Sequence, residues 1–517
     1  MRLIQASING YKHLRDLSVS FVPPEKGNPL FRDGIPIRFL IGLNGSGKSA
    51  FLEGLCLVFS RLAQDELPGF DFSLQYEIWR DGRRRVVEVS GVGGGRPDIH
   101  VFTEGQEGRL ALSSFAEHRN LLPDYVFVCA SGNNNNFFDI AVRSPRDALH
   151  GELFDASLLG KSQNSPQRQR EEIARALGAL RRLEEDPICL FIDEHTAVLA
   201  LAAFLAVLPG GEAAPCRKQI LEILDSLPQP VSFSLTLDLE RLDAFEDSCG
   251  GLFPSPDGSD GPNLSHWTTP RFYRDENGDE ETSQGDQVVT FLFEPSEAGE
   301  KPGVYVKSLT DAFASPIRLL SELIRAQNLG VIKEAHLSFR LQGAEDLLEE
   351  NALSEGEYML LVRLGLLAMG RQEESGQCLY LLDEPDVYLN ERWNIDFVSI
   401  IHQIYQGAAF RHELLVATHS SLILTDAFPE QLYYFREEHG SVKCRNIRAS
   451  TFGGSRNEIM QALFQTSHSV GNFSYSKIEE LLQKAQSAGE LEEQLKNVGS
   501  GYLRLRLLER LRRMREG

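Results

Sequence analysis

The chain has 517 residues, 42% apolar and 24% charged, which is the composition of an ordinary globular protein rather than a disordered, collagenous or membrane-spanning one. Its 52 basic and 74 acidic residues give a formal net charge of −22. This balance excludes nucleic-acid binding through the overall electric field, although a local basic patch remains allowed. At roughly 150 residues per domain, the length predicts about three domains.

The N-terminal part of the chain predicts an α/β fold. Residues 3–21 alternate between polar and apolar positions and predict two strands joined by a turn. Residues 38–43 predict a short buried strand that enters a glycine-rich turn. Residues 72–78 and 86–89 then predict an antiparallel hairpin.

The middle of the chain predicts an insertion. Residues 165–208 have a helical pattern, and their longest apolar run, 197–208, is too short to span a bilayer and predicts a buried helix. Residues 254–287 combine proline, glycine, serine and acidic residues, which is typical of a linker. Strand-like segments from residue 288 onward lead into a second α/β stretch that ends near residue 440.

The C-terminal residues predict helices. The tail over residues 502–517 carries six arginines against two glutamates, so DNA binding is one interpretation of it. Its apolar residues recur at helical spacing, and packing against another subunit or a partner is the second interpretation. The stripe consists of Leu503, Leu507, Leu511 and Met514.

Seven cysteines are scattered along the chain without a C-x-x-C pair, which argues against a disulfide framework and against a zinc site. The first residues lack the apolar segment of a signal peptide. We therefore expect a cytoplasmic protein that does not associate with a membrane.

Residues 42–49 match G-x-x-x-x-G-K-S, with an apolar strand before them and a helix-like segment after them. Glycines in such a loop let backbone N–H groups curl around phosphates, and the following helix N-terminus adds positive partial charge. Lys48 would reach the β and γ phosphates of ATP, and the Ser49 hydroxyl would bind Mg²⁺, which prefers hard oxygen ligands. The predicted nucleotide-binding residues are Gly42, Asn44, Gly45, Ser46, Gly47, Lys48, Ser49 and Ala50.

Two apolar segments end in Asp-Glu and compete for the acidic half of the site: residues 188–194 and residues 378–384. The second is favoured because it continues as Pro385-Asp386, whereas the first runs directly into the apolar helix. Asp383 would then hold Mg²⁺, directly or through water, and Glu384 would polarise the attacking water as general base. The first segment is interpreted as a buried strand with an acidic end.

The motif LSEGE over residues 353–357 has two compatible interpretations. Ser354, with Glu357 three positions later, predicts a capping box at the start of a helix. The same helix N-terminus can present Ser354, Gly356 and Glu357 to a γ-phosphate that belongs to another subunit. The position of the motif upstream of Asp383 favours this second role.

An apolar strand over residues 414–418 ends at His419. An isolated histidine at such a place is more often a buried structural residue. Because His419 follows the other motifs in this order, it is interpreted as a sensor of the γ-phosphate.

The order G-x-x-x-x-G-K-S, LSEGE, LLDEPD and VATHS resembles the ABC-type ATPase family, and within it the branch of RecF, SMC and OLD proteins. The resemblance covers roughly residues 1–60 and 335–430. It implies hydrolysis of ATP with Mg²⁺ at sites that form between subunits of a homo-oligomer. Residues 9–17 also resemble the first hairpin of that branch, in which a basic residue, here Lys12, approaches the nucleotide.

The resemblance and the sequence pattern together divide the chain into four regions, of which the resemblance covers only parts of the two ATPase lobes. We expect an N-terminal ATPase lobe over 1–150, a largely helical insertion with an acidic linker over 151–335, a C-terminal ATPase lobe over 336–440, and a helical segment for assembly or partner docking over 441–517. The glutamine of the family's Q-loop has no clear counterpart. The strand over 122–128 and the residues from 131 to 136 are a candidate for that place.

The D-x-D metal pair of OLD nucleases is absent after His419, so nuclease activity is not expected on this chain. The architecture resembles the stand-alone ATPases of bacterial anti-phage systems such as Septu and PARIS. That resemblance implies a separate effector, such as an HNH or TOPRIM nuclease. The alternative is a RecF-like, DNA-binding ATPase of repair or chromosome maintenance. A transporter subunit is disfavoured because 305 residues separate Ser49 from Ser354.

Overall fold

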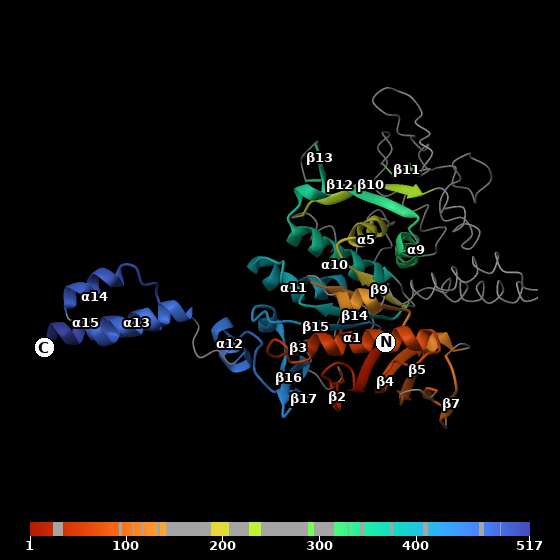
Figure 1. Ribbon diagram of the computed structural model, residues 1–517, viewed down its shortest axis with the longest axis horizontal. Coiled ribbons are helices and arrows are strands. Elements are labelled where there is room, and N and C mark those ends of the chain that lie inside the picture. Colours follow the sequence, from red (N-terminus) through yellow and green to blue (C-terminus); the bar gives the residue numbers. More distant parts are fainter. Residues whose placement is uncertain are drawn as a thin grey trace, which may run out of the picture. The chain divides into compact units, whose positions relative to one another are not determined.

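A seven-stranded sheet organises Met1–Phe452, the larger of two units in the computed structural model (Figure 1). The strands from β16 to β9 run parallel, and β17 at the edge is antiparallel to β16. Parallel strands covered on both faces need continuous apolar runs, and β3, β8, β14 and β15 are buried along their whole length. The order is β17 (Ser441–Asn446), β16 (Leu432–Glu438), β3 (Ile37–Ile41), β15 (Glu413–Ala417), β14 (Cys378–Asp383), β8 (Tyr125–Ala130) and β9 (Cys189–Ile192).

The structure describes sixteen segments of the chain. They are residues 1–23, 35–92, 96–106, 108–115, 118–131, 135–140, 188–205, 227–238, 288–293, 315–328, 330–341, 346–372, 376–406, 412–464, 470–485 and 487–516. The expected linker over 254–287 and most of the expected insertion lie outside these ranges.

An antiparallel six-stranded sheet covers the helix that follows the glycine-rich loop. This helix, α1 (Lys48–Ala63), is buried on most sides because its apolar residues share one core with both sheets. The close contact of Gly54 with Ile8 shows how near α1 comes to the antiparallel sheet. The order of that sheet is β2 (Leu17–Ser20), β1 (Arg2–Asn9), β4 (Asp71–Arg80), β5 (Arg83–Gly91), β6 (Asp98–Thr103) and β7 (Leu110–Leu112).

A second antiparallel sheet has four strands: β11 (Val288–Phe293), β10 (Gln229–Asp238), β12 (Ile332–Arg340) and β13 (Leu347–Glu349). Figure 1 shows it above α5 (Ala197–Phe204), α9 (Pro316–Asn328) and α10 (Glu355–Gln372). All eight residues of α5 are buried, because α5 packs on α9, α10 and the strands β10 and β12. The buried helix predicted from residue 197 is therefore confirmed over its described part.

The unit also contains the helix α11 (Glu391–Ile404) and several short elements. The helix α11 begins at Asn390, whose side chain caps the Trp393 N–H. The others are α2 (Asn135–Phe138) and the 3₁₀ turns η3 (Arg119–Leu121), η5 (Glu350–Ala352), η6 (Ile423–Asp426) and η7 (Pro429–Gln431). No helix of the described residues is long and apolar enough to cross a bilayer.

The second unit, Gly453–Gly517, contains α12 (Arg456–Phe464), α13 (Asn472–Lys484), α14 (Ala488–Leu495) and α15 (Tyr502–Glu516). Leu507 and Leu511 of the C-terminal stripe are buried against α13 and α14, and Leu503 and Met514 flank them. The stripe thus forms the core of its own unit, in place of the intermolecular packing expected for it.

The arginines of α15 also bind within the same unit. Arg504 donates to the carbonyl oxygens of Leu495 and Val498, at and just beyond the end of α14. Other ion pairs and hydrogen bonds join Arg506 to Glu479, Arg510 to the Ala485 carbonyl, and Arg515 to Glu492. Of the six arginines in the tail, Arg506 and Arg515 are thus paired with carboxylates, whereas the bonds of Arg504 and Arg510 to carbonyl oxygens leave their charge in place.

The predicted α/β class is confirmed, with the phosphate-binding motif between β3 and α1. The region boundaries differ from the expected ones. The units divide between Phe452 and Gly453 because residues 441–446 form β17 and extend the seven-stranded sheet. Within the 151–335 region, β9 and β11 match the predicted strands at 188–194 and from residue 288, whereas β10 of the four-stranded sheet was not predicted.

Candidate nucleotide-binding site

Residues 42–47 form a tight loop between β3 and α1, as the motif predicts. Gly42 has a φ of 151°, and a Cβ there would lie 2.3 Å from the Phe435 carbonyl oxygen, so only glycine fits. Gly47, with a φ of 99°, turns the chain into the helix. Of the other predicted loop residues, Asn44 and Gly45 are exposed and Ser46 and Ala50 are buried.

This loop fits a phosphate group. The Ser46 Oγ atom is buried and has no hydrogen-bond partner among the described residues. The first turn of α1 contains no acidic residue, so the positive end of the helix dipole is not neutralised there. A phosphate would supply the acceptors and the negative charge that this loop lacks.

Lys48 lies at the centre of the site. Its ammonium group donates to the Gly42 and Leu43 carbonyl oxygens at 3.1 and 3.3 Å, and it is 2.8 Å from the His419 Nε2 atom. Burial lowers the pKa of Lys48, and the carboxylates of Glu384 and Asp383 oppose that shift. Burial, and to a smaller extent the charge of Lys48, lower the pKa of His419 to about 4. The imidazole is therefore neutral at pH 7, and its Nε2 accepts from Lys48.

The Ser49 hydroxyl donates to the Asp383 Oδ1 atom at 2.9 Å, across 334 residues of sequence. Burial raises the pKa of Asp383 to about 6, and the hydrogen bond from Ser49 opposes this rise. A hydroxyl oxygen and a carboxylate oxygen in contact are the hard ligands that Mg²⁺ prefers, so these two residues fit the metal.

Glu384 has a strained backbone, with a φ of 50°, a conformation that costs a non-glycine residue on the order of 1 kcal/mol. Its N–H donates to the Ala417 carbonyl at 2.8 Å, which holds the strand end in place. Its half-exposed carboxylate lies 3.7 Å from the His419 Nε2 atom. Lys48, Ser49, Asp383, Glu384 and His419 thus come together from β14, β15 and the start of α1.

Ser354 of the LSEGE motif does not belong to this group. Ser354 and Glu357 form the predicted capping box, in which each backbone N–H bonds the other residue's side chain at 3.0 and 3.3 Å. Ser354 is exposed, and the described hydrogen bonds of its hydroxyl group go to Glu357. Gly356 allows α10 to start against the loop after β14, since a Cβ there would lie 2.3 Å from the Tyr388 carbonyl oxygen.

Lys12 binds Glu53, one turn beyond Ser49 on α1, and Glu53 also accepts from the Tyr11 hydroxyl at 3.2 Å. Lys12 has a φ of 51° and is exposed. The structure therefore places Lys12 against the helix that follows the loop, and its approach to a nucleotide stays a prediction.

Two further residues lie behind the acid pair: the buried Arg363, which sequence reasoning missed, and the half-buried Asp386, which it used only to identify the motif. Arg363 of α10 donates to the Pro385 carbonyl and to the Ser131 hydroxyl, and Asp386 accepts from the Thr418 hydroxyl at 2.6 Å. An arginine within the apolar run of α10 was the available signal for the first. The Ser131 N–H donates to the Asp383 carbonyl at 3.0 Å, which brings the candidate Q-loop strand β8 to the site.

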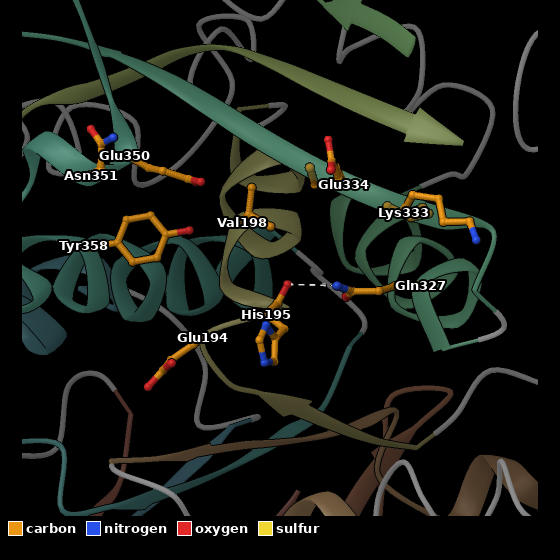
Figure 2. A pocket seen from close by; sticks show the side chains of 11 residues that line it. Glu194, His195, Val198, Gln327, Lys333, Glu334, Glu350, Asn351 and Tyr358 are labelled. Carbon is orange, nitrogen blue, oxygen red and sulfur yellow. Dashed lines mark hydrogen bonds between the residues drawn. The ribbon is translucent and has the colours of Figure 1, made fainter. Parts of the chain in front are cut away.

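The other Asp-Glu pair, Asp193-Glu194, follows β9, and Figure 2 shows Glu194 beside a cavity. Asp193 accepts from the N–H groups of His195 and Thr196, which stabilises the turn before α5. Glu194 and His195 line a separate polar cavity of about 360 Å³, shared with residues of α9, β12, η5 and α10. The interpretation of this segment as a buried strand with an acidic end agrees with this geometry.

No protein-family model and no curated protein matches the chain. Among solved structures, the chain is similar to the SMC head domain from Thermotoga maritima, at 12% identity and a TM-score of 0.34, covering 87% of this chain and 100% of that one. It is also similar to an SMC head bound to the C-terminal winged-helix domain of ScpA, at 12% identity and a TM-score of 0.35, covering 87% and 98%. TM-scores this low carry no functional argument. The function is therefore argued from the geometry of the site itself.

Proposed function

We propose that this chain is a Mg²⁺-dependent ATPase of the ABC type, whose sites form between copies of the chain. The contact between the Ser49 hydroxyl and the Asp383 carboxylate at the start of α1 carries this proposal. It joins the two halves of a nucleotide site from segments that no local interaction would bring together. The unpartnered Ser46 hydroxyl and the glycine loop support the same ligand.

Each residue has a role in this proposal that follows from its position. The loop N–H groups and Lys48 bind the phosphates, and Ser49 and Asp383 would hold Mg²⁺, which neutralises phosphate charge when bound. Glu384 orients a water and accepts its proton. His419 is neutral, is held by Lys48, and lies beside Glu384, where it can contact a γ-phosphate and the general base at the same time.

The exposure of Ser354 supports a site shared between subunits. Its helix, α10, begins in solvent with a hydroxyl and backbone N–H groups at the positive end of the helix dipole. A γ-phosphate bound on a second copy is a ligand of suitable charge. In a two-fold dimer, two such pairs form at once.

Mixing experiments test the shared site. Lys48→Ala and Ser354→Arg chains should each lack ATPase activity. An equimolar mixture should recover about a quarter of the wild-type rate, since about half of the dimers are heterodimers and each of these has one intact site of two. Ser487→Arg is a matched control, because Ser487 is also an exposed serine that caps a helix. It should leave the rate unchanged. A mixture that never regains activity would refute the shared site.

We further propose that ATP controls a separate effector, as the resemblance to the ATPases of Septu and PARIS implies. The RecF-like alternative, in which the chain binds DNA itself, would use the basic helix α15, where Arg506 and Arg515 are already paired with glutamates of their own unit. The purified chain should therefore leave plasmid, single-stranded DNA and tRNA intact with Mg²⁺ or Mn²⁺. Cleavage that a point substitution in this chain abolishes would overturn this role.

A further inference from the structure

Arg363 is a buried cation in α10, the helix that begins at the LSEGE motif. Its side chain is 3% exposed, and burial lowers its pKa. Its Nη1 atom donates to the Pro385 carbonyl at 2.7 Å and its Nη2 atom to the Ser131 hydroxyl at 3.2 Å, while Nε has no partner among the described residues. A guanidinium is costly to bury, and this one is not even fully paired.

The two partners of Arg363 flank the acid pair. Pro385 follows Glu384 directly, and the Ser131 N–H binds the Asp383 carbonyl. Arg363 therefore binds the backbone just after Glu384 directly, and the Asp383–Glu384 peptide through Ser131. The distance along α10 from Ser354 to Arg363 is about 13 Å at 1.5 Å per residue, within one unbroken helix.

We propose that Arg363 is a positioning residue that transmits a displacement of α10 to Glu384. The inference rests on the proposed function, because docking of a second copy's nucleotide on Ser354 would displace the helix. A displacement of the Pro385 carbonyl moves the residue that follows Glu384, and the strained backbone of Glu384 has little freedom to accommodate that movement. Hydrolysis in one subunit thereby depends on the docking of its partner.

Arg38 offers a matched control. It is also 3% exposed, binds the Glu413 carboxylate at 3.1 Å, and leaves its Nη2 atom unpartnered among the described residues. It lies near the start of β3, whereas the phosphate-binding loop follows the end of that strand. Replacing either arginine by lysine keeps the charge and removes the planar fork that serves two acceptors at once.

The test measures steady-state ATP hydrolysis, ATP affinity and thermal stability on the full chain. Arg363→Lys should lower kcat about tenfold and leave KM and the ATP Kd within about twofold, because only the placement of the general base changes. Arg38→Lys should lower stability at most and leave kcat unchanged. Equal kcat for the two variants, or a fall in stability alone for Arg363→Lys, would overturn the proposal.

Ser131→Ala keeps the test decisive if Arg363→Lys does not fold. It removes one of the two hydrogen bonds without burying a new charge, and kcat should fall about threefold with unchanged KM. An unchanged kcat in this variant contradicts the role of Arg363. The wild-type rate, compared with that of Asp383→Asn as the inactive reference, separates the two levels of inference. A wild type as inactive as Asp383→Asn refutes the proposed ATPase. An active wild type with normal kcat in Arg363→Lys and Ser131→Ala refutes only the positioning role.

Discussion

Two strands of one sheet, β14 and β9, end in the same Asp-Glu pair but meet different surroundings. At the end of β14, Asp383 faces the Ser49 hydroxyl, and Glu384 faces His419. At the end of β9, Asp193 caps the turn into α5. The strand β8 lies between them in the sheet. An acidic strand end thus becomes a candidate site only where the sheet order places the phosphate-binding loop opposite it.

Replacing the two aspartates should give the largest contrast. Asp383→Asn should lower ATP hydrolysis at least about 100-fold, because it weakens the oxygen set around Ser49 that would hold Mg²⁺. Asp193→Asn should leave hydrolysis within about twofold, since an amide oxygen can still accept from the turn. Phosphate release on purified proteins measures both. An active Asp383→Asn enzyme would mean that the wrong pair was assigned to the site.

The second contrast is between the glutamates of the two pairs, Glu384 and Glu194, whose replacement should affect ATP hydrolysis differently. Glu384→Gln should lower kcat by about 100-fold to 10,000-fold while ATP binding persists, because only the proton acceptor is lost. The trapped nucleotide should favour the assembled state, which light scattering with ATP detects. The control, Glu194→Gln, alters the separate cavity and should hydrolyse ATP at the wild-type rate. If Glu384→Gln instead fails to bind ATP, Glu384 has a structural role.

The smallest effect concerns the capping role of Asp193. Asp193→Ala removes the acceptor for two N–H groups and the Thr196 hydroxyl, and should reduce the free energy of unfolding by about 1–2 kcal/mol. Asp193→Asn keeps an acceptor and should cost less than about 0.5 kcal/mol. Urea denaturation of both variants tests this difference. Equal stability of Asp193→Ala and wild type would exclude the cap.

The motifs of the site were predictable because each depends on local chemistry. The phosphate-binding loop needs glycine at positions 42 and 47, where a Cβ would not fit. The capping box joins Ser354 to Glu357, only three positions later. The apolar runs before Asp383 and His419 are long enough to predict buried strands. Arg363 was not predictable as a partner of Pro385 and Ser131, because those contacts join three separate elements.

The sequence by itself determined the α/β class, the phosphate-binding loop, the helix caps and the two candidate acid pairs, since each of these follows from side-chain type and spacing within about ten residues. Tertiary structure alone decided which acid pair meets Ser49, because the order β3, β15, β14, β8, β9 depends on packing between distant segments. It also decided that the α15 stripe and arginines serve their own unit. Periodicity shows that a helix has an apolar face, but only the fold shows what covers it.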